Sequence, residues 1–267
     1  VDTGDNGADT IDVAGLTATG RFDTVSADTI KLSTGANITG VKGEGNNAGT
    51  ALNANNLTLV KPDGGDGASV TMTAAQNNSF TSATASGTTD QISISDADNV
   101  TGLADVDSYV LADGSQTFTL GAEGQNVTTD GSGGGLITID TGTLTAVSGT
   151  FADGGTDTIA LNVETTANIS SAVTTDVDTI DLVSSVDATM TISQHNKLDT
   201  VAGGNTVTLS DAGTVTGDAD VGAYNLAAGN NTFIMADSGQ TVVGNIGIDL
   251  ITGGNGDDRI SGMEGAD

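Results

Sequence analysis

Large apolar residues recur every eight or nine positions along much of the chain, with polar residues and glycines between them. A helix would place apolar residues three and four positions apart, and no such stripe persists, so no helix is predicted. The pattern predicts short strands that are joined by turns rich in Gly, Asn, Asp and Ser. The apolar series runs through Leu198, Val207, Val215, Tyr224, Phe233, Val242, Ile251 and Ile260, and earlier through Val100, Tyr109, Phe118 and Val127.

Short strands at this spacing fit either an antiparallel sandwich or a solenoid of stacked half-coils. The constant spacing favours the solenoid, because stacked coils need equal lengths for each strand to lie on the one below. Stacking also gives every internal strand hydrogen-bond partners on both sides. We therefore predict an all-β fold, a right-handed parallel β-solenoid of the β-roll type, in which two nine-residue halves make one coil.

A longer repeat divides the chain into tandem units. The segment from Val100 to Tyr109 matches the segment from Val215 to Tyr224, and Met72-Thr-Ala-Ala-Gln76 matches Met190-Thr-Ile-Ser-Gln194. These matches predict a first solenoid unit over 1–128, a second over 129–243, and the start of a further unit over 244–267. The spacing is lost over 41–56 and 61–68, where we expect loops that leave the coil.

The charge balance restricts the partners. The chain has 35 acidic and 6 basic side chains and a formal net charge of −29. This charge excludes nucleic acid and anionic lipid as partners, since both carry the same sign. It resists compaction unless cations neutralise it, so a divalent metal ion is expected. No stretch approaches the length of an apolar transmembrane segment, so membrane insertion is not expected.

Three nonapeptides that are rich in glycine and aspartate follow one another at the C-terminal end. They read Gly244-Asn-Ile-Gly247-Ile-Asp249-Leu-Ile-Thr, Gly253-Gly254-Asn-Gly256-Asp-Asp258-Arg-Ile-Ser and Gly262-Met-Glu-Gly265-Ala-Asp267. One further copy near the N-terminus contains Gly4, Gly7 and Asp9. Glycines allow a turn to direct its carbonyls inward and each Asp adds charge, which suits the oxygen-rich coordination of Ca²⁺.

These nonapeptides resemble the Gly-Gly-x-Gly-x-Asp-x-apolar-x repeat of the repeat-in-toxin (RTX) β-roll proteins, a family that includes large secreted bacterial adhesins and surface-layer proteins. The resemblance covers residues 244–267 and the N-terminal copy, and elsewhere only the nine-residue rhythm persists. It implies Ca²⁺ as the cofactor. The ligands that it implies are Gly244, Gly247, Asp249, Gly253, Gly254, Gly256, Asp258, Gly262, Gly265 and Asp267, together with Gly4, Gly7 and Asp9.

The solenoid period places these residues on two edges. Turns 18 residues apart lie on the same edge, so Asp249 and Asp267 are expected to flank one ion. Asp258 belongs to the opposite edge, above the turn from Met235 to Gln240. Further upstream the sixth position of the nonapeptide holds an amide, at Gln240, Asn231, Gln125 and Gln116. We expect these amides to form hydrogen bonds between coils, which would leave Ca²⁺ at the unit junctions.

The sequence offers little for catalysis. Its only histidine, His195, has no partners for a triad or a zinc site, and we expect it to be a surface turn residue. The chain has no Cys, five Phe and two Tyr, and its six basic residues are scattered. The repeated Tyr109 and Tyr224 are expected to be core residues. We therefore do not expect an enzyme.

These features favour a structural function. We expect a calcium-dependent β-solenoid module of a secreted bacterial surface protein, which would serve in a surface layer, an extracellular matrix filament or an adhesin stalk, would be exported by type I secretion, and would be located outside the cell or on its surface. A second copy that follows Asp267 would keep Asp9 in phase, so end-to-end self-association is expected. The alternative is a binding module whose loops recognise a glycan, such as a cell-surface polysaccharide, or a host protein.

Overall fold

The computed structural model describes residues 10–13, 15–21, 28–42, 52, 54–131, 133–265 and 267. The chain divides into two compact units. Unit 1 comprises the chain up to Ile139 together with Gly149–Ile159, and unit 2 comprises Asp140–Ser148 together with Ala160–Asp267. Both units are built from short parallel strands, and no helix of the described residues is long and apolar enough to span a membrane.

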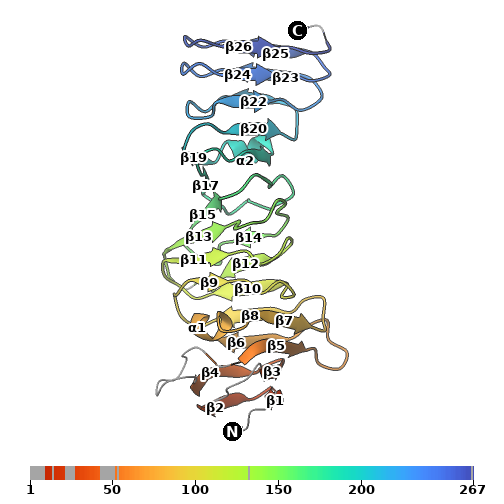
Figure 1. The fold of residues 1–267 in the computed structure, drawn as a ribbon, viewed down its shortest axis with the longest axis vertical. Helices are drawn as coiled ribbons and strands as arrows, with labels where there is room; N and C mark the ends of the chain where they lie inside the picture. The colour runs from red at the N-terminus through yellow and green to blue at the C-terminus, as the bar shows by residue number, and fades with distance from the viewer. Residues whose placement is uncertain are drawn as a thin grey trace. The chain divides into compact units, whose positions relative to one another are not determined.

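Unit 1 contains three parallel sheets (Figure 1). The first has the order β1 (Thr10–Val13), β3 (Asp28–Ser33), β5 (Ala54–Val60) and β7 (Ser82–Ala85). The second has the order β2 (Thr17–Arg21), β4 (Asn37–Lys42), β6 (Ser69–Met72), β8 (Gln91–Ile94), β10 (Ser108–Leu111), β12 (Asn126–Thr129) and β14 (Phe151–Ala152). The third begins with β9 (Val100–Thr101), β11 (Gln116–Thr119) and β13 (Leu136–Asp140).

Unit 2 repeats this arrangement. One sheet contains β15 (Thr158–Val163), β17 (Thr179–Leu182) and β19 (Leu198–Val201). A second contains β16 (Ala167–Asn168), β18 (Ala188–Met190), β20 (Thr206–Leu209), β22 (Ala223–Asn225), β24 (Thr241–Val243) and β26 (Arg259–Ser261). A third contains β21 (Thr214–Thr216), β23 (Asn231–Ile234) and β25 (Asp249–Thr252).

The strand register confirms the predicted parallel β-solenoid and its coil length. Ser108 pairs with Asn126 in unit 1, and Asn231 pairs with Asp249 in unit 2, so these coils have the expected 18-residue step. Longer steps also occur within the chain, as between Val127 and Phe151. Coils nearer the N-terminus are longer, because residues 61–68 form turns between β5 and β6 as expected. The other expected loop, 41–56, falls largely outside the described residues.

Stacked apolar side chains fill the interior of each unit. Tyr109 and Phe118 are both completely buried, with ring centroids 4.8 Å apart, and Tyr224 and Phe233 repeat the contact at 4.7 Å. Such tilted aromatic pairs add about 0.5–1.5 kcal/mol beyond their buried area. The prediction that both tyrosines are core residues is confirmed. Of the predicted core series, Ile260 is 47% exposed, because the coil that contains β26 is covered on one side only.

Two single-turn helices contradict the expectation that the chain has none. They are α1 (Ala74–Asn77) and α2 (Ile192–His195), and they occupy equivalent places in the tandem repeat. In each, a threonine side chain accepts a hydrogen bond from the backbone N–H of a glutamine three residues later, and the glutamine side chain accepts one from the threonine N–H. This reciprocal capping box explains why the turn is helical.

Candidate functional site

One edge of unit 2 brings Asp249 and Asp267 together, as predicted. Asp249 begins β25 and is 3% exposed, and its Oδ1 accepts hydrogen bonds from the backbone N–H and side-chain amide of Asn231 at 3.1 and 2.8 Å. Its Oδ2 accepts one from the N–H of Asn245 at 3.1 Å. Asp267 Oδ1 in turn accepts the N–H of Asp249 at 3.0 Å. Each aspartate therefore accepts a hydrogen bond from the backbone N–H of the residue 18 positions earlier, directly beneath it.

The predicted glycines of this edge are required by close backbone contacts. Gly247 and Gly265 form an isolated parallel bridge, and a Cβ on Gly265 would lie 1.7 Å from the carbonyl oxygen of Gly247. A Cβ on Gly244 would lie 2.4 Å from the carbonyl oxygen of Gly262 and 2.6 Å from Asp249 Oδ2. These glycines let two turns stack with their carbonyl and carboxylate oxygens close together.

The opposite edge places Asp258 above the turn from Met235 to Gln240, again as predicted. Asp258 Oδ1 accepts the N–H of Gln240 at 3.0 Å, and Oδ2 accepts the N–H of Gly254 at 2.8 Å. Gly253, Gly254 and Gly256 lie in the same turn, and a Cβ on Gly256 would lie 2.1 Å from the nitrogen of Gly239.

The chemistry of the Asp249 edge fits a calcium ion. Two carboxylates and the carbonyls of stacked glycine turns are hard oxygen donors of the kind that Ca²⁺ prefers. Carboxylate oxygens that accept one hydrogen bond retain a lone pair for a cation. Among the described residues no three His, Cys, Asp or Glu side chains come together, so a cation here would depend on Asp249, Asp267 and main-chain carbonyls. The N-terminal copy, with Gly4, Gly7 and Asp9, lies outside the described residues, and the metal assignments remain predictions.

Buried amides occupy the sixth nonapeptide position where aspartate is absent. Gln240 is 2% exposed, and its Nε2 donates to the carbonyl oxygens of Asp218 and Val221 in the coil below at 2.7 and 2.9 Å, while its Oε1 accepts the N–H of Ala236 at 2.7 Å. Gln125 makes the equivalent contacts in unit 1, with Nε2 donating to two carbonyls of the preceding coil. Gln240 and Gln125 therefore link coils through main-chain groups. Gln116 donates within its own turn, to the carbonyl of Ala112, and Asn231 reaches the next coil through the carboxylate of Asp249.

Sequence reasoning missed three members of this amide set. The side chains of Gln76, Gln194 and Asn205 are at most 1% exposed, and each donates from its amide nitrogen to two main-chain carbonyls of an adjacent coil. Gln76 and Gln194 are the capping-box residues of α1 and α2. The threonine three residues before each glutamine was the signal that could have identified them.

A buried polar pair corrects the expectation for His195. His195 is 5% exposed, and its Nε2 lies 2.9 Å from the hydroxyl of Tyr224. That hydroxyl accepts the N–H of Asp218 at 2.7 Å, which leaves its proton for Nε2. Burial lowers the pKa of His195 below its usual 6.5, against smaller opposing effects of Asn196 and Asp218. The ring is therefore a neutral hydrogen-bond acceptor in the core.

Unit 1 builds the corresponding pair without a titratable group. Asn77 stands at the repeat position of His195, and its Oδ1 accepts a hydrogen bond from the hydroxyl of Tyr109 at 3.3 Å. The same hydroxyl accepts the N–H of Leu103 at 2.8 Å. Burial raises the pKa of both Tyr109 and Tyr224 well above the usual range, so both hydroxyls remain protonated.

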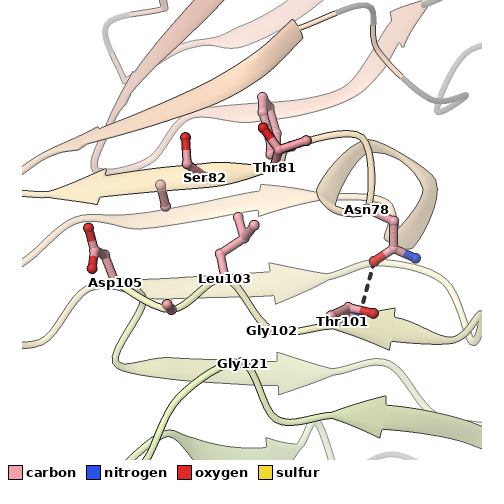
Figure 2. A pocket seen from close by; sticks show the side chains of 11 residues that line it. Asn78, Thr81, Ser82, Thr101, Gly102, Leu103, Asp105 and Gly121 are labelled. Carbon is pink, nitrogen blue, oxygen red and sulfur yellow. Dashed lines mark hydrogen bonds between the residues drawn. The ribbon is translucent and has the colours of Figure 1, made fainter. Parts of the chain in front are cut away.

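An open groove of about 610 Å³ lies in unit 1 beside the free edge of β7 (Figure 2). Ser82 and Ala83 of β7 form one side, and the turn from Thr101 to Asp105 forms the other. Asn78 holds this turn, because its Oδ1 accepts the N–H of Thr101 at 3.0 Å. The aromatic ring in the lining, Phe80, is only 4% exposed, so the groove presents small polar and apolar groups and little aromatic surface.

Comparisons of the chain with protein-family models, with curated proteins and with solved structures gave no match. The functional argument therefore depends on the residues and their geometry.

Proposed function

We propose that the chain is a structural, calcium-dependent β-solenoid module of a secreted bacterial surface protein, in a surface layer, a matrix filament or an adhesin stalk. The parallel solenoid is compatible with a structural repeat module, since stacked coils extend by repetition. The observation that carries the calcium proposal is the stacking of Asp249 and Asp267 at one edge among the carbonyls of glycine turns.

The charge of the chain supports a coupling between calcium and folding. With a net charge of −29, the acidic turns repel one another in the folded state, and this repulsion opposes stacking. Asp249 and Asp267 contribute to this repulsion, because one residue lies directly above the other in the register. A bound cation would neutralise the pair, so its binding free energy would add to the free energy of folding. Ca²⁺ is scarce inside cells, so the module would become ordered on export.

Calcium titration of a triple variant tests this coupling. Asp249, Asp258 and Asp267 are replaced by asparagine, and the control carries the same charge change at the exposed residues Asp176, Asp199 and Asp220. The wild type and the control are expected to melt at higher temperature in millimolar Ca²⁺ than in chelator, as followed by circular dichroism, whereas the triple variant is expected to lose most of this shift. Equal shifts in all three proteins would refute the role of the C-terminal turns.

The C-terminal coil supports end-to-end self-association. Its side chains Ile248, Leu250, Ile260 and Met263 are 47–65% exposed, and β26 has a strand partner on one side only. Apolar patches and free strand edges favour the addition of another coil. An Ile260→Lys variant is expected to abolish assemblies that sedimentation velocity detects in wild type. The matched control is Val173→Lys, since Val173 is also 47% exposed but lies away from β26. If both variants assemble like the wild type, this surface is not the contact.

The groove beside β7 favours a second candidate, a module that binds a glycan. Its hydroxyl, amide and carboxylate groups can hydrogen-bond to sugar hydroxyls, whereas it lacks an exposed ring among its described lining residues. Replacement of Asp105 and Ser82 by alanine would reduce binding to a cell-surface polysaccharide if this candidate is correct. The measurement is retention on the immobilised polysaccharide, with the exposed Asp199→Ala variant as control.

A further inference from the structure

Unit 1 contains a buried carboxylate that has no hydrogen-bond partner. Asp157 is 6% exposed, and neither of its carboxylate oxygens contacts a donor within hydrogen-bond distance among the described residues. The residue stands just before β15, and the side chain that follows, Thr158, is exposed while Ile159 is buried. Asp157 and Ile159 therefore share the inward direction of the strand, as the two-residue period requires.

A second carboxylate closes the same turn. Asp153 Oδ1 accepts hydrogen bonds from the N–H of Gly155 at 2.7 Å, from the hydroxyl of Thr129 at 3.2 Å and from the N–H of Asp157 at 3.3 Å. The turn from Asp153 to Asp157 is thus folded around one carboxylate oxygen. The side chain of Asp153 is partly buried, and its Oδ1 lies 3.3 Å from the backbone nitrogen of Asp157, so both carboxylates belong to one turn.

Three described glycines stacked beneath Asp157 supply carbonyls and no side-chain donor. Gly133, Gly134 and Gly135 lie in the preceding coil, where Gly133 accepts a hydrogen bond from the Thr156 hydroxyl at 3.0 Å and Gly135 accepts the N–H of Thr158 at 2.8 Å. A run of glycines cannot offer a hydroxyl, amide or cation to a carboxylate. A described hydroxyl nearby, that of Thr129, donates to Asp153 and not to Asp157.

Another buried aspartate of unit 1 shows the usual arrangement. Asp90 is completely buried, and its two oxygens accept the N–H groups of Ala68 and Gly87 at 2.7 and 2.9 Å. The fold is therefore able to satisfy a buried carboxylate with main-chain donors, and it does not do so at Asp157. A buried ionised carboxylate without donors is strongly unfavourable unless a cation or a proton compensates its charge.

We propose that Asp157 and Asp153 hold a calcium ion in unit 1, with main-chain carbonyls of the glycine turns completing its oxygen coordination. Ca²⁺ fits better than Mg²⁺, because it accepts irregular sets of carboxylate and carbonyl oxygens, whereas Mg²⁺ requires near-octahedral geometry. Within residues 152–160, Asp157 takes the sixth position, but Ala152 and Asp153 stand where the nonapeptide has glycines. The inference comes from the partnerless carboxylate and does not depend on the calcium sites proposed for the C-terminal turns.

Hydrogen exchange of the full chain tests the site directly. Amide exchange is followed by mass spectrometry in Ca²⁺, in Mg²⁺ and in chelator, for peptides covering 149–159 and, separately, 245–267. If local opening releases the ion, protection over 149–159 should rise about 100-fold when free Ca²⁺ is a hundred times the dissociation constant. The Asp157→Asn variant should lose this increase, and the Asp90→Asn variant, which alters a buried aspartate with donors, should keep it.

The outcomes separate this site from the C-terminal turns. Protection of 149–159 that disappears only in Asp157→Asn supports the proposal, whatever happens over 245–267. Equal exchange in Ca²⁺ and chelator over 149–159 overturns it. Equal protection by Mg²⁺ overturns the assignment to Ca²⁺. If Asp157→Asn does not fold, the exchange of wild-type 149–159 in Ca²⁺, in Mg²⁺ and in chelator still tests the proposal.

Discussion

The amide of Gln240 can be removed with little change of volume, which makes its contribution measurable. In a Gln240→Leu variant the carbonyl of Val221 and the N–H of Ala236 lose the partners that the amide provides. The carbonyl of Asp218 also loses the amide, but it still accepts the N–H of Val221 at 3.2 Å. Two main-chain groups are therefore left without a partner in a site that is 2% exposed.

The expected loss follows from these two groups. A buried polar group without a partner costs about 1–3 kcal/mol, and the added apolar surface of leucine recovers part of this, so the variant should lose about 2–4 kcal/mol. That is a large fraction of a typical free energy of unfolding of about 5–15 kcal/mol. Gln125→Leu should lose at least as much, because its Oε1 accepts two N–H groups, those of Gly121 and Ala122.

Urea unfolding followed by far-ultraviolet circular dichroism, in the presence of chelator, measures this loss without a contribution from calcium. Gln91→Leu is the matched control, since Gln91 is only partly buried and accepts a hydrogen bond from the Ser69 hydroxyl. The control should change the free energy of unfolding by less than about 0.5–1 kcal/mol. If Gln240→Leu changed it no more than the control, the buried amides would not be what links the coils.

Three further predictions concern the polar residues of the interior. Because burial lowers the pKa of His195 below 6.5, the unfolded chain binds its proton first, so the free energy of unfolding should fall as the pH drops below about 6.5. Urea midpoints measured between about pH 7.5 and 5 should show this fall in the wild type. The His195→Asn variant, which carries the residue found at the equivalent Asn77, should not show it. Tyr109→Phe removes a hydroxyl with two hydrogen bonds and should lower the free energy of unfolding by about 1–2 kcal/mol, measured in the same way. Gln240→Asp should destabilise the chain in chelator, because a carboxylate would then face Asp258 across the turn. Ca²⁺ should stabilise this variant more than it stabilises the wild type. Calorimetric titration that shows no additional calcium binding would contradict this prediction.

The fold could be predicted because its main determinant is a period. Tyr224 and Val242 lie one coil apart in the sequence pattern, and they pair in the structure with the same 18-residue step. Where coils keep this length, the strands stack in one way, so the register follows from the spacing. The longer N-terminal coils escape this argument, because residues inserted between β5 and β6 change the step without changing the strands themselves.

Single side chains were harder to predict, because their environment depends on contacts that the period does not specify. The sequence predicts that His195 is a surface turn residue. In the structure α2 directs its ring into the core, where Nε2 accepts a hydrogen bond from the hydroxyl of Tyr224. The equivalent Asn77 makes the same contact with a different functional group. The repeated feature is a buried hydrogen-bond acceptor opposite a tyrosine. A comparison of residue types does not show it, because the acceptor is His in one unit and Asn in the other.

The sixth nonapeptide position shows why the motif locates the candidate sites only in part. There Asp249 accepts hydrogen bonds from the coil below, whereas Gln240 donates to its carbonyls, so each residue type satisfies a different set of main-chain groups. Donors in the neighbouring turns stabilise the Asp249 carboxylate, and the ion proposed at that edge would add to them. A buried aspartate without donors depends on another source of compensation for its charge. Asp157 has no donor, although it holds the same sixth position. The difference lies in the turn beneath, where the described residues Gly133, Gly134 and Gly135 have no side chain that could donate a hydrogen bond.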